Sequence, residues 1–399
     1  MNSTLLSLEE AQARLIALAP TLPEMRVDGP AAFGAYLSQD LIANRTQPPA
    51  DLSAMDGYAI CGEGPWIRVG ESRAGLPFDG ALEPGDCVRI STGAHMPDGA
   101  DRVLIQENAS IDAERVALAN GEAGPAPGAH VRFAGFDFMK SDVVLRKGTR
   151  LGPAQIALAR AAGYDSLPVF DRPGTAVLDS GDELASDAAR CGPFQIPASN
   201  GAMLAAMLSP YTGLVENLGP VGDDMDALAA ALAKANGHIL VTSGGASVGD
   251  HDLMQDALKA WGAEINFWKV AIKPGKPLMV ATKERDWGQQ VILGLPGNPV
   301  SSFVTAFLFA LPLVRAASGD TDPLPKHTMR VAAEDLPATS ARHEFLRGVS
   351  DGREVRLAGS QDSSALMALA QANCLISRPP GANPVRAGQL VPVHNLQNG

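Results

Sequence analysis

Cysteine is scarce in this chain, with four among 399 residues, and no two of them form a C-x-x-C pair. Scattered thiols without histidines at metal-ligand spacing argue against a disulfide framework and against a structural zinc site. The four cysteines are Cys61, Cys87, Cys191 and Cys374.

Long apolar runs are also missing, and the N-terminus does not have the pattern of a signal peptide. The longest apolar run, Phe303–Val314, is shorter than the roughly 20 residues that a membrane helix needs, and it contains Pro312. The N-terminus carries Glu9 and Glu10 and no basic residue before Arg14, unlike a signal peptide. We therefore expect a cytoplasmic protein without a membrane span.

Basic residues are outnumbered by acidic ones, and the net charge is −12. Nucleic acids and anionic membrane surfaces are not attracted to such a chain, so we expect neither as a partner. An anionic ligand would need a local basic cluster. The chain is also too long for one core, which predicts two to four domains at about 100–200 residues each.

The first half of the chain predicts a split helical domain and a β-rich domain. Ser7 followed by Glu10 is a capping-box pattern that predicts a helix over 7–18, and a second helix is expected over 31–43. Pro153 opens a further helix that ends before Gly163. We assign residues 1–45 and 140–172 to the helical domain. Between them lie short strands separated by prolines and glycines, at 66–69, 87–90 and 102–105, which assign residues 46–139 to a β-rich domain.

The second half predicts a three-layer α/β domain and a C-terminal β-barrel. Apolar strands such as 175–178 alternate with helices that begin at Asn200 and Asp224, which is typical of a mostly parallel sheet covered on both faces. This α/β domain covers 173–325. Short alternating runs then predict a small barrel over 326–399.

Two glycine loops follow buried strands in the α/β domain. The strand at 238–242 runs into the loop 243–249, and the strand at 291–295 runs into 296–299. Ligands of open α/β sheets bind where parallel strands end, and glycine loops let backbone N–H groups approach an anion. We expect the floor of an active site here.

Lysines and carboxylates near these loops suggest a site for anions and a metal. Lys269, Lys273 and Lys276 form a basic cluster, and on one extended strand Lys269 and Lys273 would lie ~13 Å apart on the same face. Solvated surface lysines are the alternative interpretation. Carboxylates suit Mg²⁺ bound together with a substrate phosphate, where the ion would polarise the phosphoryl bond. Helix capping is the alternative for Asp250 and Asp224, and a hairpin turn for Asp56.

Six segments occur in an order and spacing that resemble the molybdopterin molybdenumtransferase family. They are Ser53–Ala59, Arg89–Gly93, Gly181–Leu184, Ser243–Asp252, Lys273–Pro277 and Leu295–Pro299. The resemblance implies the domains predicted above, assembled as a homodimer whose active site is shared between subunits. It also implies a Mg²⁺-dependent transferase that inserts molybdate into adenylylated molybdopterin, with release of AMP, and a molybdopterin adenylyltransferase as the upstream donor.

The resemblance and the residue types in the loops together predict roles for individual residues. The expected catalytic residues are Asp56, Thr92, Glu183, Asp223, Asp252 and Lys273. The expected metal ligands are Glu183, Asp250 and Asp252. The expected residues for substrate and molybdate are Ser180, Gly181, Ser243, Gly244, Gly245, Ser247, Gly249, Lys269, Lys276, Pro296, Gly297, Asn298, Pro299, Arg347 and Ser363.

Two other functions are compatible with parts of the chain. One is a molybdopterin adenylyltransferase built on the α/β domain alone, which the additional domains disfavour. The other is a molybdopterin-binding paralogue or scaffold with reduced catalysis. Asp362, beside Ser363, adds a negative charge to the expected molybdate site, where it would weaken binding of an anion. The histidines show no triad spacing, which disfavours a Ser-His-Asp hydrolase.

Overall fold

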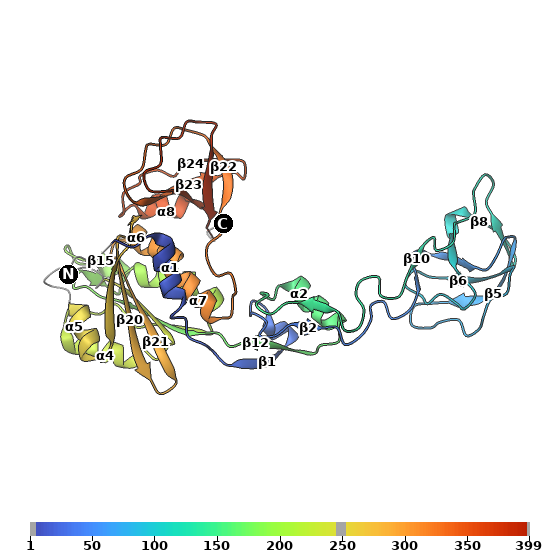
Figure 1. The fold of residues 1–399 in the computed structure, drawn as a ribbon, viewed down its shortest axis with the longest axis horizontal. Coiled ribbons are helices and arrows are strands. Elements are labelled where there is room, and N and C mark those ends of the chain that lie inside the picture. The colour runs from blue at the N-terminus through green and yellow to red at the C-terminus, as the bar shows by residue number, and fades with distance from the viewer. Residues whose placement is uncertain (1–4, 245–252, 397–399) are drawn as a thin grey trace. The chain divides into compact units, whose positions relative to one another are not determined.

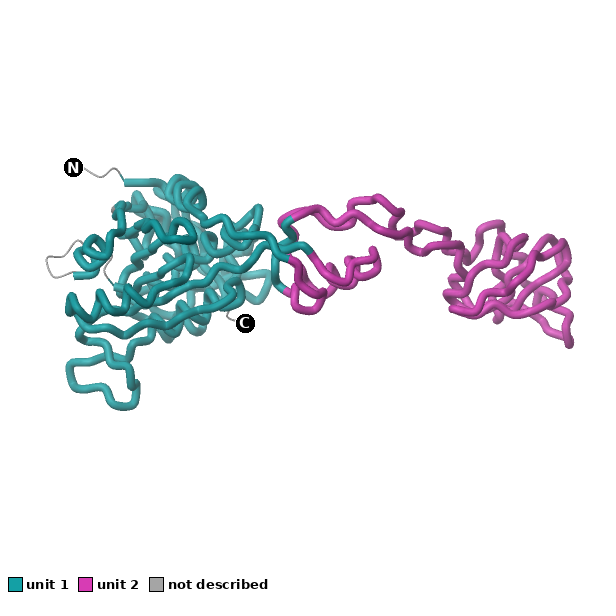
Figure 2. Tube along the Cα trace, turned by 90° about the horizontal axis from the view of Figure 1, so that it is seen from below, with its two compact units in different colours: residues 1–25, 34–38, 168–399 teal, residues 26–33, 39–167 magenta. Residues whose placement is uncertain are grey.

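The computed structural model describes residues 5–244 and 253–396, and the chain divides into two compact units (Figure 2). The first unit comprises Met1–Met25, Gly34–Ser38 and Pro168–Gly399, and the second comprises Arg26–Phe33 and Gln39–Leu167. The strands β1 (Glu24–Asp28) and β12 (Ser166–Phe170) lie where the chain passes from one unit to the other.

The first unit is built on a six-stranded sheet that is mostly parallel, as predicted. Four neighbouring strands are parallel, the next strand runs antiparallel to them, and the edge strand beyond it runs antiparallel to that one and so in the direction of the first four. The order is β16 (Leu214–Asn217), β13 (Gly174–Asp179), β17 (Ile239–Ser243), β21 (Gly288–Leu295), β20 (Pro277–Arg285) and β18 (Glu264–Lys269).

Helices cover both faces of this sheet, which confirms the three-layer prediction (Figure 1). Side chains alternate along a strand, so in β13 Val177 faces one layer while Ala176 and Leu178 face the other. The layer that includes Val177 contains α1 (Leu8–Ile16), α3 (Asn200–Leu208), α6 (Pro299–Thr305), η5 (Ala306–Ala310) and α7 (Leu311–Ala317). The opposite layer contains α4 (Met225–Lys234) and α5 (Leu253–Ala260).

The continuous helix Pro299–Ala317 is the core helix of this unit. Its 19 residues are long and apolar enough to cross a membrane, a longer stretch than the run Phe303–Val314 recognised in the sequence. However, 89% of its apolar window is buried inside the protein, against the sheet and α1, α3 and α8. Burial of this kind identifies it as a helix of a protein core.

The N-terminal helix forms as predicted but belongs to the α/β unit. Ser7 caps α1, and its hydroxyl oxygen accepts a hydrogen bond from the N–H of Glu10 at 3.1 Å. Ala11 and Leu15 are buried in the same cluster as α7, so residues 1–25 fall outside the predicted split helical domain. The cause is the apolar face of α1, which is buried by packing against the core helix.

The second predicted helix, 31–43, is wrong. The structure has a short 3-10 helix, η1 (Gly29–Ala32), followed by a turn, two isolated bridge residues and a bend before β2 (Leu41–Ile42). Gly34 has φ +78°, which breaks a helix at this point. The helix α2 (Pro153–Ala161) forms as predicted, and Gly163 follows it with φ +99°.

The second unit carries a six-stranded sheet, which confirms the β-rich prediction. Strands predicted at 66–69, 87–90 and 102–105 correspond to β5, β6 and β7. The order is β7 (Arg102–Ile105), β4 (Gly57–Ile60), β6 (Asp86–Ile90), β5 (Trp66–Ser72), β9 (Arg115–Leu118) and β8 (Ala109–Asp112). The remaining elements are β3 (Leu52–Ser53), η2 (Gln106–Asn108), β10 (Val131–Arg132) and β11 (Val143–Leu145).

The C-terminal part of the first unit is a closed barrel, as predicted. Five strands pair in a ring, β23 to β24 to β22 to β26 to β25 and back to β23. They are β22 (Thr328–Ala332), β23 (His343–Ser350), β24 (Glu354–Leu357), β25 (Cys374–Arg378) and β26 (Leu390–Asn395). The helix α8 (Leu366–Gln371) packs near α6, and β19 (Ile272–Lys273) adds to β23 from outside the ring.

Candidate active site

Two polar cavities are lined by predicted site residues that the structure describes, and the larger of them, about 760 Å³, lies at the carboxyl ends of the parallel strands. Its floor comes from the loop after β13, the end of β17 and the 296–299 turn after β21, as the sequence predicted for ligand loops. One wall is the short parallel pair β14 (Leu184–Ala185) and β15 (Ile196–Pro197). The predicted residues that line it are Ser180, Glu183, Ser243, Gly244, Pro296, Gly297, Asn298 and Pro299.

The smaller polar cavity, about 380 Å³, is lined by residues of the barrel and of the loop after β19. Lys273 lies here beside Glu344, with 3.4 Å between the ammonium nitrogen and a carboxylate oxygen. Ser363 and Ser301 add hydroxyl groups, and backbone of 361–363 completes the wall. An ammonium group and hydroxyl groups in one cavity suit an oxyanion.

The two cavities share the 296–301 segment as a common wall. Pro299 lines the larger cavity and Ser301 the smaller one, on the first turn of α6. The Asn298 amide donates a hydrogen bond to the Ser363 hydroxyl at 3.2 Å, and the Val300 N–H donates to the Ser363 carbonyl at 3.1 Å. A ligand in one cavity is therefore separated from a ligand in the other by a single turn of backbone.

Lys269 and Lys273 do not share one strand, so the predicted ~13 Å spacing on one face is wrong. β18 ends at Lys269 within the α/β sheet, and Lys273 lies in β19, which pairs with the barrel strand β23. Gly275, two residues after Lys273, has φ +100°, and a Cβ there would lie 2.3 Å from the Thr305 hydroxyl. Lys269 and Lys276 are exposed and line neither cavity.

A group of carboxylates includes Glu183, which lines the larger cavity, and its neighbours Asp182 and Asp223. Asp182 accepts a hydrogen bond from the Asp223 N–H at 2.9 Å, and Glu183 lines the cavity. Burial raises the pKa of Asp223, and the negative charges of Asp182 and Glu183 raise it further. Mutual repulsion of this kind is relieved by a cation, so the donor set fits Mg²⁺. No group of three metal ligands is assembled among the described residues.

Five predicted site residues lie outside the described residues, between 245 and 252. They are Gly245, Ser247, Gly249, Asp250 and Asp252. Asp224, for which capping was the alternative interpretation, does cap α4: its carboxylate accepts the Ala227 N–H at 2.8 Å.

Asp56 and Thr92 are brought together in the second unit. One Asp56 carboxylate oxygen accepts the Thr92 N–H at 2.6 Å and the Thr92 hydroxyl at 2.9 Å. These hydrogen bonds lower the pKa of Asp56, so the carboxylate is ionised at neutral pH. The pair is a fixed, exposed negative group.

Arg347 is buried behind the smaller cavity, with 1% of its surface exposed. Its guanidinium donates to the carbonyl oxygens of Ser360 at 2.8 Å and Asp362 at 3.1 Å, and burial lowers its pKa. The side chain therefore holds the 360–363 loop in place, and it is not among the residues that line the cavity.

Asp362 lines the smaller cavity, but its carboxylate is held by Ser364. One oxygen accepts the Ser364 hydroxyl at 2.6 Å and the Ser364 N–H at 2.9 Å. Asp362→Asn keeps an acceptor for Ser364 and removes a negative charge beside the expected oxyanion. We expect KM for molybdate to fall about threefold to tenfold, since a nearby charge in a partly solvated site contributes on the order of 1 kcal/mol. An unchanged KM would show that the carboxylate does not act on the anion.

The sequence did not single out Asp179 and Asn200, which both line the larger cavity. Asp179 is the last residue of β13 and is 3% exposed, and one carboxylate oxygen accepts the Gly201 N–H at 2.6 Å. A carboxylate directly after an apolar strand was the available signal. Only the structure reveals that it is buried.

Asp179→Asn is expected to stabilise the folded protein at neutral pH. Burial raises the pKa of Asp179, although the Gly201 N–H opposes the change. A raised pKa means that the carboxyl group favours folding below its unfolded pKa of about 3.9, and that this contribution is lost as pH rises through the folded pKa. The stability difference between variant and wild type should therefore grow from pH 4 to pH 7. Urea denaturation across this range measures it, and a difference independent of pH would contradict it.

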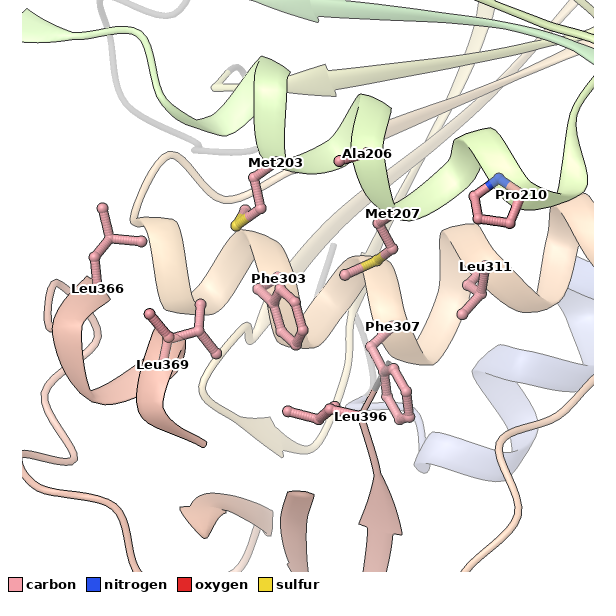
Figure 3. Close-up of a pocket in the computed structure, with 11 residues that line it drawn as sticks. Met203, Ala206, Met207, Pro210, Phe303, Phe307, Leu311, Leu366, Leu369 and Leu396 are labelled. Atoms are coloured by element: carbon pink, nitrogen blue, oxygen red, sulfur yellow. The ribbon is translucent and has the colours of Figure 1, made fainter. Parts of the chain in front are cut away.

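A third cavity, about 550 Å³ and wholly apolar in its lining, adjoins the site (Figure 3). Met203 and Met207 of α3 lie opposite Phe303 and Phe307 of the core helix. Leu366 of α8 lines both this groove and the larger polar cavity.

Three family profiles match the chain in the order of its domains. The MoeA N-terminal region (domain I and II) matches residues 6–163, a probable molybdopterin binding domain matches 176–316, and the MoeA C-terminal region (domain IV) matches 330–396. The central profile covers the α/β sheet and its glycine loops. Fold and cavities thus define a multidomain protein of the molybdopterin-binding class.

Curated relatives extend over the whole chain. A molybdopterin molybdenumtransferase from Haemophilus influenzae is 31% identical, with 98% of each chain covered. One from Nostoc sp. is 34% identical over 93% of this chain and 88% of the relative. The molybdopterin biosynthesis MoeA protein of Pyrococcus horikoshii OT3 has the same fold, with a TM-score of 0.84, 24% identity, and 98% and 100% coverage. The chain belongs to the molybdopterin molybdenumtransferase family, which confirms the resemblance seen in its motifs.

Proposed function

We propose that this chain inserts molybdate into adenylylated molybdopterin and releases AMP. The observation that carries the proposal is the pair of polar cavities on either side of the 296–301 segment. The larger cavity suits a nucleotide-bearing pterin substrate, and the smaller one suits an oxyanion. Two anions that repel one another are thereby held apart at a fixed short separation, which lowers the entropy lost on reaching the reactive arrangement.

Residues of this chain take distinct parts in the reaction. Lys273 and Ser363 hold molybdate in the smaller cavity, and Arg347 keeps the 360–363 loop in shape. The loops at 179–183 and 296–299 hold the adenylylated pterin. Lys269 and Lys276 attract the anions from the rim. Metal insertion is coupled to departure of AMP from the substrate.

Glu183 and Asp223, with Asp252 and Asp250 from the neighbouring segment, are the residues proposed to hold Mg²⁺. The ion would supply a positive charge that polarises the phosphoryl bond and stabilises the charge that develops as AMP leaves. The fit rests on the repelling carboxylates of this group and on the raised pKa of Asp223.

A direct assay tests the function. Purified protein is incubated with adenylylated molybdopterin, molybdate and Mg²⁺, and AMP is quantified. Molybdate-dependent and Mg²⁺-dependent release of AMP supports the proposal. Incorporation of AMP into molybdopterin from ATP would instead identify an adenylyltransferase, and substrate binding without turnover would identify a scaffold.

The proposal includes a cytoplasmic homodimer supplied by a molybdopterin adenylyltransferase. Asp56 and Thr92 of one subunit complete the site of the other. The apolar groove beside the site supports a protein partner, because apolar surface of this kind is stabilised by being covered. Burial of the apolar helix in the core supports a protein free of the membrane.

Complementation between two inactive variants tests the shared site. Asp56→Asn and Lys273→Met are each expected to inactivate their own homodimer. In a mixed dimer one site keeps both residues, so co-expression should restore about a quarter of wild-type activity per subunit. AMP release by co-expressed and separately expressed variants gives the comparison. An inactive mixture that contains mixed dimers would contradict the shared site.

A further inference from the structure

Two buried oxygen atoms in the larger cavity lack a hydrogen-bond partner among the described residues. They are Oδ1 of Asp179 and Oδ1 of Asn200. Both residues line the cavity, and Asp179 is 97% buried. Buried acceptors are nearly always paired, so two unpaired ones in the lining of a substrate cavity point to a ligand that donates to them.

The other polar atom of each side chain makes hydrogen bonds that hold the side chain in place. The second carboxylate oxygen of Asp179 accepts the N–H of Gly201, which is the residue after Asn200. The Asn200 amide nitrogen donates to the Ser243 hydroxyl at 2.8 Å and to the Gly297 carbonyl at 2.7 Å. A carbonyl only accepts, so the Asn200 amide nitrogen must face Gly297, and its oxygen is the free atom. The Asp179 carboxylate thus lies against the first turn of α3, which begins at Asn200, and both residues line the same cavity.

The anionic parts of the proposed substrate do not suit this corner of the cavity. A buried carboxylate repels phosphate and molybdate, so it must face a neutral part of the substrate that is rich in N–H groups. Two acceptors in the lining of one cavity match an edge with two neighbouring donors. The 2-amino-4-oxopyrimidine ring of a pterin has such an edge, in its ring N3–H and its exocyclic amino group. The amino group of adenine, by contrast, lies between ring nitrogens that accept.

We propose that Asp179 and Asn200 recognise the pterin of the substrate through its 2-amino and N3–H donors. The inference rests on the proposed function, which supplies the pterin substrate, and deepens it by assigning the end of the cavity where the pterin binds. The adenylyl group then extends toward the carboxylates at 182, 183 and 223. Asp179 acts as a specificity-determining residue: it selects the pterin and takes no part in the chemical step.

Binding of two small pteridines tests this assignment. Pterin carries the 2-amino group, and lumazine carries an oxo group at the same position, which replaces a donor with an acceptor. We expect wild-type protein to bind pterin about tenfold more tightly than lumazine, since an unmatched polar group in a buried site typically costs a factor of this size or more. Asp179→Asn should reduce the ratio of the two dissociation constants to about one, because its amide can donate to the lumazine oxygen.

Matched variants keep the test decisive. Asp187→Asn makes the same chemical change at an exposed carboxylate outside the cavity lining, where it caps a short helical turn, and should keep the wild-type ratio. Should Asp179→Asn fail to fold, Asp179→Ser takes its place, because its hydroxyl still offers an acceptor to Gly201. The inference is overturned by equal wild-type affinity for the two pteridines, by an unchanged ratio in the Asp179 variant, or by binding of neither compound at millimolar concentration.

The AMP assay separates this inference from the proposed function. If the wild-type protein releases AMP from its substrate but shows no preference for pterin, only the pterin assignment is contradicted. If the protein prefers pterin through Asp179 but releases no AMP, the proposed function is contradicted and the pterin site is supported.

Discussion

Lys273→Met should lower kcat/KM for molybdate on the order of 100-fold. Lys273 is the cationic residue among the described residues that line the smaller cavity, and Glu344 lies 3.4 Å from it. Its removal takes away the attraction for the anion and leaves Glu344 with its Ser340 hydrogen bonds but without this cationic partner. Two unit charges ~4 Å apart interact by up to about 4 kcal/mol near a protein surface, and the half-exposed Lys273 side chain retains part of this. AMP release measured over a range of molybdate concentrations gives the effect.

Two further variants test whether the loss of the Lys273 charge causes the lower activity. Lys273→Met with Glu344→Gln should recover part of the loss, because the second change removes a negative charge that repels the anion. Lys326→Met, at an exposed lysine paired with Asp322, should leave activity unchanged. Equal activity of wild type and Lys273→Met at low molybdate would remove Lys273 from the anion site.

Gly57→Ala should destabilise the sheet of the second unit by about 3 kcal/mol. Gly57 begins β4, which pairs with β6 and β7, and a Cβ at this position would lie 2.1 Å from the Leu104 carbonyl oxygen. The backbone of β7 would have to move, and overpacking in a filled interior typically costs 1–3 kcal/mol or more. Because Asp56 is the preceding residue, AMP release should fall together with stability.

Hydrogen exchange of peptides from residues 57–60 and 102–105 measures this effect locally. Gly124→Ala is a matched control in the same unit, since the nearest atom to its Cβ would be a Leu118 methyl group at 3.9 Å. Exchange in Gly57→Ala that equals that of the control would contradict the expected clash.

The sequence predicted those features that local patterns determine. Ser7 and Glu10 define the start of α1, and apolar strands followed by glycines locate the loops that line the larger cavity. The order of domains followed from changes in pattern along the chain. These features depend on neighbours in sequence, so periodicity and capping residues reveal them.

Features that depend on contacts distant in sequence were not predicted. The segment 31–43 was predicted to be a helix, but in the structure it contains the end of a 3-10 helix, a turn, a bend and the short strand β2. Lys269 and Lys273 looked like one strand because the pairing of β19 with β23, which separates them, involves residues about 70 positions away. The unpaired oxygens of Asp179 and Asn200 are defined by what does not contact them, which no local pattern records.

The strand β19 has a consequence for anyone who recombines these domains. It lies between β18 and β20 in the chain, yet it pairs with β23 and carries Lys273 on that pairing. In a chimera joined at residue 325, Lys273 would come from this protein and the barrel from another. The two residue pairs between β19 and β23 would then determine the position of the Lys273 ammonium group. Successful exchange of the barrel therefore requires residues 270–276 to be exchanged as well, although they lie far upstream of residue 325 in the chain.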